Sequence, residues 1–224
     1  MTSNGYRVGV LGATGLVGTT ILELLAAREF PAAEVVPFAS ERSAGKQIEW
    51  NGRTLSCRAL SEDSIQGLDL VLSSAGGSIS AEWTPRLVEA GAVVVDNTSH
   101  WRMHDEVPLV VSEVNPEALA EHRGIIANPN CSTMQMVVAL KPLFDAAGIQ
   151  RLVISTYQAV YGTGKAAIDE LREQSRAVLD GTAPKAQIYP HQIAFNALPQ
   201  AGSFPEGDDH TDEERKLINE TRKI

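Results

Sequence analysis

The sequence predicts an α/β fold built on a mostly parallel sheet, and two observations support this prediction. The first is the order of the opening segments: the apolar run YRVGVL meets the glycine-rich turn GATGLVG, and TTILELLAAREF follows with apolar residues at helical spacing. The second is that three later apolar runs, LDLVLSSAGG, GAVVVDNTS and GIIANPN, end in small or polar residues, as buried parallel strands do. We therefore expect a Rossmann-type domain with its ligand site at the carboxyl ends of the strands.

The glycine turn after the first apolar run predicts a nucleotide-binding site. Gly12 suits a tight turn, Gly15 lets backbone N–H groups approach a pyrophosphate, and Gly18 lets the helix pack closely on the strand. The G-x-x-G-x-x-G spacing differs from the most common dinucleotide fingerprint. A plain turn between strand and helix is the alternative, but the position directly after the first strand favours nucleotide binding.

The second apolar run, EVVPFAS, ends in a segment that bears on the identity of the nucleotide. A dinucleotide site commonly offers an acid to the ribose 2′-hydroxyl at this place, and Glu41 would fit that role. Arg42 between Ser40 and Ser43 would instead hold a 2′-phosphate through charge-assisted hydrogen bonds. We therefore favour NADP as the cofactor, with NAD as the alternative.

Composition and charge argue against several classes of partner. The chain has 224 residues, enough for hydrophobic cores in one large or two small domains, and a formal net charge of −9. An acidic protein is not attracted to nucleic acid or to an anionic membrane, so the sequence predicts a small-molecule partner. The opening residues lack the layout of a signal peptide, and no apolar run is long enough to span a bilayer. Two cysteines are too few for a disulfide framework, which fits a reducing compartment, so we expect a cytoplasmic protein. We expect no metal site.

Cys131 lies in the segment ANPNCST, where a turn meets the apolar stretch CSTMQMVVALKPLF. This stretch is long enough for a buried helix bent by Pro142, so Cys131 is predicted at or near a helix N-terminus. Unpaired N–H groups and the positive end of the helix dipole there favour a thiolate and an oxyanion on a carbon bonded to it. Such a thiol beside a nicotinamide can add to an aldehyde, and loss of hydride then leaves a thioester. A small buried thiol is the alternative, and it is the interpretation that we favour for Cys57.

Several motifs together resemble those of the aspartate-semialdehyde dehydrogenases of bacterial type, along essentially the whole chain. In family order they are GATGLVG, FASERSAGK, SSAGGS, VVDNTSHWRM, VPLVVSEVN, ANPNCSTMQM, STYQAV, IAFNALPQ and EERKLINETRKI. The resemblance implies a Rossmann domain joined to an α/β or α+β domain for substrate binding and dimerisation. It also implies a reaction of amino-acid biosynthesis, the NADP- and phosphate-dependent interconversion of L-aspartate 4-semialdehyde and 4-phospho-L-aspartate, in a homodimer or homotetramer of the complete protein.

The resemblance also implies roles for individual residues. Cys131 matches the acyl-thioester nucleophile, and Gln158 matches a residue that orients the substrate. Arg102 and Lys216 match phosphate-binding positions, and Glu213 matches the position that faces the substrate ammonium group. From the sequence alone, a solvated ion pair between Glu213 and Lys216 on one helix face is an equal alternative. The matched cofactor positions are Gly12, Thr14, Gly15, Leu16, Val17, Ser40, Arg42, Ser43, Ser74, Ala75, Gly76, Asn97, Tyr161 and Gly162.

Two departures from the family pattern concern the site. The family usually has Ser-Gly after QAV, in a loop near the nicotinamide, where this chain has Tyr161 and Gly162. A phenol pointing inward there would crowd the cofactor pocket. The family's general-base histidine and its substrate-carboxylate arginine belong to an Arg-x-Pro-Val and Gly-His region that does not occur in this sequence. None of the histidines present lies in the matching motif, so we assign none as the base.

We expect residues 1–147 to form the NADP-binding Rossmann domain, including the helix that bears Cys131. Residues 148–224 would then begin a truncated substrate and dimerisation domain, because AAGIQ precedes a β-rich run, RLVISTYQAV. Two alternatives to the dehydrogenase remain. One is a reductase of the N-acetyl-glutamyl-phosphate type, against which the TYQAV and EERK motifs count. The other is an NADP-binding fragment that catalyses nothing.

Overall fold

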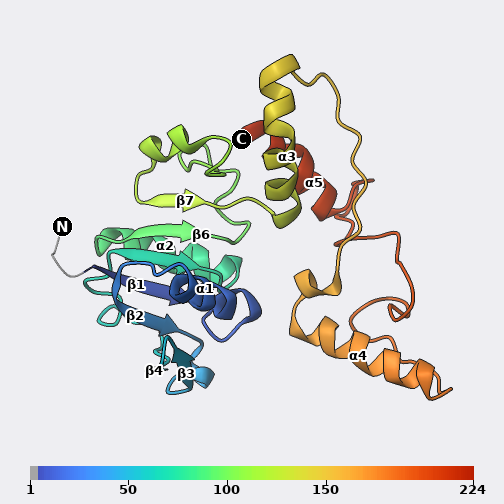
Figure 1. The fold of residues 1–224 in the computed structure, drawn as a ribbon, viewed down its shortest axis with the longest axis horizontal. Coiled ribbons are helices and arrows are strands. Elements are labelled where there is room, and N and C mark those ends of the chain that lie inside the picture. Colours follow the sequence, from blue (N-terminus) through green and yellow to red (C-terminus); the bar gives the residue numbers. More distant parts are fainter. Residues whose placement is uncertain (1–4) are drawn as a thin grey trace. The chain divides into compact units, whose positions relative to one another are not determined.

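The computed structural model describes residues 5–224. The chain divides into two compact units (Figure 1). The first comprises the described residues up to Gly148 together with Asn219–Ile224, and the second comprises Ile149–Ile218. The division along the chain falls next to the residue at which the sequence predicts a change of domain, but the last six residues belong with the first unit.

The first unit contains a five-stranded parallel sheet in the order β2-β1-β5-β6-β7 (Figure 1). Its elements are β1 (Tyr6–Leu11), α1 (Leu16–Ala27), β2 (Ala32–Phe38), η1 (Glu41–Ser43), β3 (Gln47–Trp50), β4 (Arg53–Ser56), β5 (Leu70–Ser73), α2 (Gly77–Glu89), β6 (Val93–Asp96), η2 (Pro116–Glu121), β7 (Ile125–Ala127) and α3 (Cys131–Ala147). The apolar runs of the sequence therefore form the predicted parallel strands, and the mostly parallel α/β fold is confirmed.

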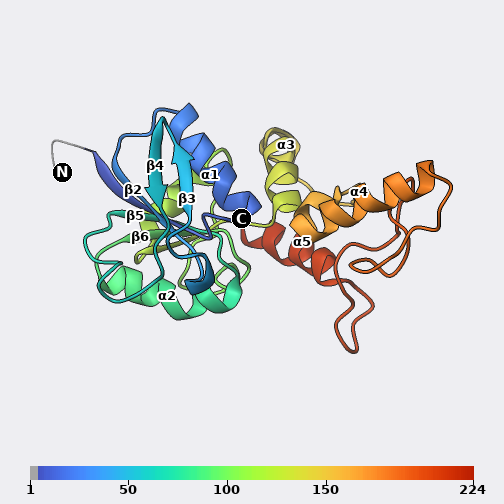
Figure 2. The same ribbon diagram turned by 90° about the horizontal axis from the view of Figure 1, so that it is seen from below.

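Helices α1 and α2 cover opposite faces of this sheet, as two perpendicular views show (Figures 1 and 2). On the α1 face, Val8 and Val10 of β1 belong to one buried cluster with Leu22. On the α2 face, Phe38 of β2 and Leu87 belong to a second buried cluster. Strands buried on both faces must be apolar at every position, which is why these runs show no alternation of polar and apolar residues.

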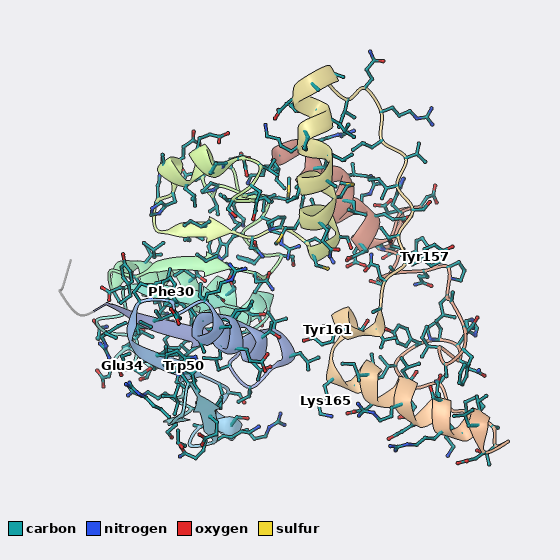
Figure 3. The ribbon with its side chains drawn as sticks, viewed as in Figure 1. Phe30, Glu34, Trp50, Tyr157, Tyr161 and Lys165 are labelled. Carbon is teal, nitrogen blue, oxygen red and sulfur yellow. The ribbon has the colours of Figure 1, made fainter. Side chains whose placement is uncertain are left out.

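The antiparallel hairpin β3–β4 packs outside the main sheet against α1. Trp50, labelled in Figure 3, donates its indole N–H to the carbonyl oxygen of Leu22 at 2.8 Å. The same indole joins the apolar cluster on the α1 face. One aromatic side chain therefore attaches the hairpin to the helix through both packing and a hydrogen bond.

Helix α3 begins at Cys131 because Asn130 caps it. The Asn130 side-chain oxygen accepts hydrogen bonds from the N–H groups of Ser132 and Thr133, which satisfies two of the donors that a helix start leaves unpaired. The helix ends where Gly148 adopts a φ of 69°, a conformation that favours glycine. Pro142 lies inside the helix, as the sequence indicates.

The second unit contains η3 (Val160–Thr163), α4 (Lys165–Leu179) and most of α5 (Asp212–Lys223). The sequence GKAAIDELREQSRAVLDG has the pattern of a helix closed by a glycine, and it forms α4, with Gly181 after it at a φ of 70°. The prediction of β structure over residues 151–160 is wrong for this structure, since these residues form no strand. A strand requires a hydrogen-bonded neighbour, and no segment among residues 5–224 pairs with this run.

A buried polar network organises the loop that follows α4. Glu170, 6% exposed, accepts hydrogen bonds from the N–H groups of Gln187 at 2.9 Å and Ile188 at 2.5 Å. Gln174, 1% exposed, accepts from the N–H groups of Ile193 and Ala194 at 2.9 and 3.1 Å. Two side chains one helical turn apart therefore hold a loop that has no regular secondary structure of its own.

Helix α5 begins with a capping box, for which a threonine followed three residues later by a glutamate is the typical sequence pattern. The N–H of Thr211 donates to the Glu214 carboxylate at 2.7 Å, and the N–H of Glu214 donates to the Thr211 hydroxyl at 3.2 Å. The helix runs from the second unit into the first, which it enters at Asn219. Among residues 5–224 no helix combines the length and apolar character needed to cross a membrane.

Gly18→Ala is expected to destabilise the first unit by about 2 kcal/mol or more, because a Cβ at Gly18 would overlap the backbone of Gly12 and Ala13. Gly77→Ala is the matched control, since a Cβ there meets nothing closer than His100 at 4.0 Å. It should leave stability within about 1 kcal/mol of wild type. Urea unfolding measures both variants, and equal stabilities would contradict the packing argument.

Glu170→Ala is expected to release the loop over residues 187–189, whose N–H groups Glu170 accepts, while α4 stays folded. The amide hydrogens of this loop should exchange at least about tenfold faster, since the charged acceptor that pairs them is removed. Hydrogen exchange followed by mass spectrometry measures the effect. Glu173→Ala, at an exposed position of the same helix, is the control and should leave the exchange rates of the loop unchanged.

Candidate functional site

The candidate residues of the first unit gather at one edge of the parallel sheet. Parallel strands end at the same edge, and the loops that follow all five strands lie there (Figure 1). These loops, together with the helix starts that follow them, contain the predicted positions Gly12, Thr14, Gly15, Leu16, Val17, Ser40, Arg42, Ser43, Ser74, Ala75, Gly76, Asn97, Arg102 and Cys131. Positions scattered over more than a hundred residues of sequence therefore belong to one edge of the sheet.

The three glycines of the first turn are required for different structural reasons. Gly12 has a φ of 76°, and a Cβ there would lie 2.5 Å from the carbonyl oxygen of Ser74, so no other residue fits. Gly18 packs against the backbone of Gly12. Gly15 has an ordinary φ of −84°, and a Cβ there would meet only the Gly12 oxygen, at 3.2 Å. Packing explains Gly12 and Gly18, whereas Gly15 leaves an exposed backbone that another molecule can approach closely.

The start of α1 is open toward this edge. No side chain caps the helix at Gly15, in contrast to the start of α3. Thr14 and Leu16 are half-buried beside the turn, and Val17 is exposed. A helix start with uncapped N–H groups and a positive dipole end can bind an anion such as a pyrophosphate.

The segment after β2 presents a cationic side chain. Arg42 lies in the short helix η1, with Ser40 before it and Ser43 at its end. Arg42 is exposed, and within residues 5–224 it forms neither a hydrogen bond nor an ion pair. Its guanidinium is therefore available to a ligand, and the neighbouring Glu41 is exposed as well.

The loop after β5 lies against the first glycine turn. The N–H of Ser74 donates to the carbonyl oxygen of Leu11 at 3.1 Å, and the Ser74 oxygen adjoins Gly12. Gly76 precedes α2 with a φ of 94°, and no side chain caps this helix either. Ala75, between them, packs against the apolar cluster on the α2 face.

A buried aspartate organises the loop after β6. Asp96, fully buried, accepts hydrogen bonds from the Ser80 hydroxyl at 2.6 Å and from the N–H and hydroxyl of Thr98 at 2.8 and 2.5 Å. Ser80 also accepts the indole N–H of Trp101 at 2.9 Å. The network fixes both ends of the turn that carries Asn97 and leads to Arg102.

Arg102 is buried and already bound to protein acceptors. Its Nη1 donates to Glu220 at 2.9 Å and its Nη2 donates to the carbonyl oxygen of Asn97 at 2.9 Å. Its Nε is buried and has no hydrogen-bond partner in the described structure. The guanidinium fork suits a carboxylate or a phosphate, and in this structure it holds the carboxylate of Glu220.

Cys131 is exposed and is the first residue of α3, as the sequence predicts. The Asn130 side chain occupies the N–H groups of Ser132 and Thr133, so these two donors are not free to hold an oxyanion. The N–H of Cys131 itself donates no hydrogen bond within residues 5–224. Cys57, by contrast, is buried, as predicted, and burial raises the pKa of its thiol despite the charge of Lys46.

The remaining predicted residues belong to the second unit. Gln158 is exposed and donates only to the Thr156 hydroxyl, at 3.3 Å. Tyr161 and Gly162 lie in η3, where Tyr161 is 48% exposed (Figure 3). Glu213 and Lys216 form an ion pair of 3.0 Å on one face of α5.

The charge of Lys216 is stabilised by two carboxylates. Burial opposes its charged form, but hydrogen bonds from its ammonium group to Asp212 at 2.9 Å and Glu213 at 3.0 Å outweigh burial and raise its pKa. Lys216 therefore stays cationic across the neutral pH range. The ion pair between Glu213 and Lys216, which the sequence offers as an alternative, is therefore formed. The same pair places a cationic side chain on this face of α5.

Sequence reasoning missed the side chains that support the site. Asn130 had a visible signal, since an asparagine directly before an apolar helical stretch is a typical N-cap. Asp96 had a partial signal: it ends an apolar run, and Thr98, one of its hydroxyl partners, lies two residues later, whereas Ser80 is distant in the sequence. Glu220 and Lys223 had no local signal, because their partners lie about a hundred residues earlier in the chain.

Two family models match the chain. The NAD-binding domain of semialdehyde dehydrogenases matches residues 7–122, and the dimerisation domain of semialdehyde dehydrogenases matches residues 140–224. The first match covers the glycine turn and four of the five strands of the parallel sheet, and it ends before β7. The second covers the last eight residues of α3, the second unit and the end of the chain.

Named relatives agree with these models. The chain is 56% identical to aspartate-semialdehyde dehydrogenase of Aquifex aeolicus over 98% of its own length and 66% of the relative's. It superposes with a TM-score of 0.95 and 50% identity on aspartate semialdehyde dehydrogenase II of Vibrio cholerae complexed with ASA, covering 99% of this chain and 66% of that one. The enzyme of Candida albicans, solved with NADP, gives a TM-score of 0.52 and 29% identity over 65% of this chain and 48% of that one.

The chain thus spans about two thirds of the length of the curated relatives that it matches. Within that span the identity is high, both domain models are present in family order, and the sheet edge carries the residues that the sequence motifs indicate. These findings show that the chain belongs to the aspartate-semialdehyde dehydrogenase family.

Proposed function

We propose that this protein catalyses the NADP- and phosphate-dependent oxidation of L-aspartate 4-semialdehyde to 4-phospho-L-aspartate, which runs in the reductive direction in amino-acid biosynthesis. One observation carries the proposal: an exposed thiol, Cys131, begins a helix at the same sheet edge that bears the open glycine turn. Nucleophile and nucleotide site therefore belong to one edge of a single sheet. The names of the relatives favour this substrate over a longer acyl phosphate.

The geometry of the glycine turn fits a dinucleotide. Gly15 leaves its backbone open where packing does not require a glycine, and the uncapped start of α1 offers N–H groups to a pyrophosphate. Arg42, with Ser40 and Ser43, would hold a 2′-phosphate. The Candida albicans relative solved with NADP supports this choice over NAD. When bound, the cofactor supplies the hydride acceptor.

The proposed chemistry begins with Cys131. Its thiolate adds to the aldehyde carbon, and the carbonyl electrons move to oxygen, so a thiohemiacetal oxyanion forms. The N–H of Cys131 is the donor available to that oxyanion. Collapse of the oxyanion expels hydride to the cofactor and leaves a thioester on Cys131. Phosphate oxygen then attacks the thioester carbonyl, the C–S bond breaks, and the thiolate is restored as 4-phospho-L-aspartate leaves.

The charged residues have separate tasks in this proposal. Arg102 offers the positive charge of its guanidinium, of which Nε alone has no partner among the described residues, to the attacking phosphate. Lys216 adds a second cation, whose charge two carboxylates stabilise. Glu213 faces the substrate ammonium group, for which it exchanges its ion pair with Lys216. Gln158 is exposed, and its side chain orients the substrate.

We extend the proposal to the working state of the protein. The match to a dimerisation domain over residues 140–224 supports a homo-oligomer, and we propose a homodimer. Both cysteines are free thiols, and the mechanism requires Cys131 to stay reduced. We therefore propose that the enzyme acts in the cytoplasm, where thiols remain reduced.

Cys131→Ala is expected to abolish the covalent intermediate and keep the nucleotide site. Incubation of the wild-type protein with 4-phospho-L-aspartate should attach an aspartyl group to the peptide that contains Cys131, as detected by mass spectrometry. The Cys131→Ala protein should carry no such label, lose at least about 10³-fold in turnover and bind NADP as before, as measured by calorimetry. Cys57→Ala is the control and should be labelled normally. A labelled Cys131→Ala protein would disprove the nucleophile assignment.

Arg42→Ala is expected to weaken NADP binding by about 10- to 100-fold, because one charge-assisted contact to the 2′-phosphate is lost. Affinity for NAD, which lacks that phosphate, should stay within about twofold. Arg123→Ala is the control: this exposed arginine precedes β7 and therefore lies at the opposite edge of the sheet. Calorimetric titration of both nucleotides decides the matter, and equal weakening of NADP and NAD would count against the assignment.

A further inference from the structure

Glu220 is a buried carboxylate that joins three distant segments of the first unit. Its side chain is 2% exposed. One oxygen accepts Nη1 of Arg102 at 2.9 Å, and the other accepts the backbone N–H of Asn130 at 2.6 Å. Arg102 follows β6, Asn130 directly precedes Cys131, and Glu220 lies near the end of α5.

We propose that Glu220 is a positioning residue of the site, which fixes the Arg102 guanidinium relative to the start of the helix that bears Cys131. One oxygen of the Glu220 carboxylate binds the Arg102 guanidinium, and the other binds the backbone N–H of Asn130 at the start of α3. Neither segment can shift without breaking a short hydrogen bond. This inference rests on the proposed function in that it gives the arginine and the thiol a shared anionic substrate.

The geometry of Arg102 supports a positioning task. Glu220 and the Asn97 carbonyl hold the two terminal nitrogens, which fixes the plane of the guanidinium. Nε remains buried and without a partner among the described residues, although a buried donor normally finds one. If the ion pair served stability alone, a protein acceptor for Nε would stabilise it further. A bound anion would supply that acceptor.

The position of Asn130 supports the same task. Glu220 holds its backbone N–H, while its side chain caps the first turn of α3. A shift of Asn130 therefore moves the N-cap and, with it, the first helical residue, Cys131. The Glu220 carboxylate thus positions the Cys131 thiol through the backbone of Asn130, and it positions Arg102 through the guanidinium directly.

Lys223, three residues after Glu220 on the same helix, binds the backbone of the loop that carries Arg102. Its ammonium group donates to the carbonyl oxygens of Arg102, His104 and Val107 at 2.8, 2.6 and 2.9 Å. Burial lowers the pKa of Lys223, and the charge of Asp105 opposes this shift. The end of α5 therefore holds both the side chain and the backbone of the arginine loop.

Two alkylating reagents of different charge test the proposal. Iodoacetate is an anion and iodoacetamide is neutral, so the ratio of their rates at one thiol reports a cation held beside it. Peptide mass spectrometry separates Cys131 from the buried Cys57. In the wild-type chain the ratio at Cys131 should exceed that of glutathione, because the guanidinium attracts the anionic reagent.

Glu220→Asp keeps the charge but shortens the side chain by one methylene, so it cannot reach both partners. The iodoacetate to iodoacetamide ratio at Cys131 should fall at least about threefold, since only the geometry has changed. Glu214→Asp makes the same chemical change in the capping box of the same helix and should leave the ratio unchanged. An unchanged ratio in Glu220→Asp, or an equal fall in both variants, would overturn the proposal.

A second variant covers a failure of Glu220→Asp to fold, which circular dichroism detects. Glu220→Gln keeps the length but removes the charge that neutralises Arg102, so the same ratio should rise at least about threefold. A wild-type ratio in Glu220→Gln would equally overturn the proposal. The assay contains neither NADP nor an aspartyl substrate. Absence of the aspartyl thioester would refute the proposed function and leave this result standing, whereas unchanged ratios would refute only the role of Glu220.

Discussion

The arrangement of the site depends on one buried carboxylate, that of Glu220. A buried carboxylate is costly unless it is paired, and that of Glu220 is paired through two short hydrogen bonds, to Arg102 and to Asn130. They connect the loop after β6, the start of α3 and the end of α5, which are far apart in the sequence. The same constraint explains why the last residues of the chain belong with the first unit.

The three helix starts at the carboxyl edge of the sheet are prepared for different tasks. Those of α1 and α2 follow glycines and have no side-chain cap, which leaves their N–H groups open to an anion. That of α3 is capped by Asn130, which spends two N–H groups on holding the helix start in place. The proposed cofactor needs open donors, whereas the proposed nucleophile needs a fixed position. The same backbone feature is therefore used in two ways within one sheet edge.

The second unit relies on side chains where the first relies on a sheet. Residues 151–160 form no strand, and the loop after α4 has no regular structure. Glu170 and Gln174 supply the acceptors that strand neighbours supply elsewhere. Order in this unit therefore depends on a few buried polar groups, and losing one of them removes several hydrogen bonds at once.

The sequence by itself determined the parallel sheet, the glycine turn, the helix starting at Cys131 and the capping box at Thr211, because these depend on local apolar pattern, backbone freedom and end-group chemistry. It also indicated the exposed arginine at position 42, since a loop after a parallel strand faces the ligand edge. Only the tertiary structure decided the partners of Arg102 and the roles of Asp96, Glu220 and Lys223, and it showed the predicted β run at 151–160 to be unpaired. Both outcomes have one physical reason: a long-range hydrogen bond, whether between strands or to a buried charge, depends on a partner that no local pattern specifies.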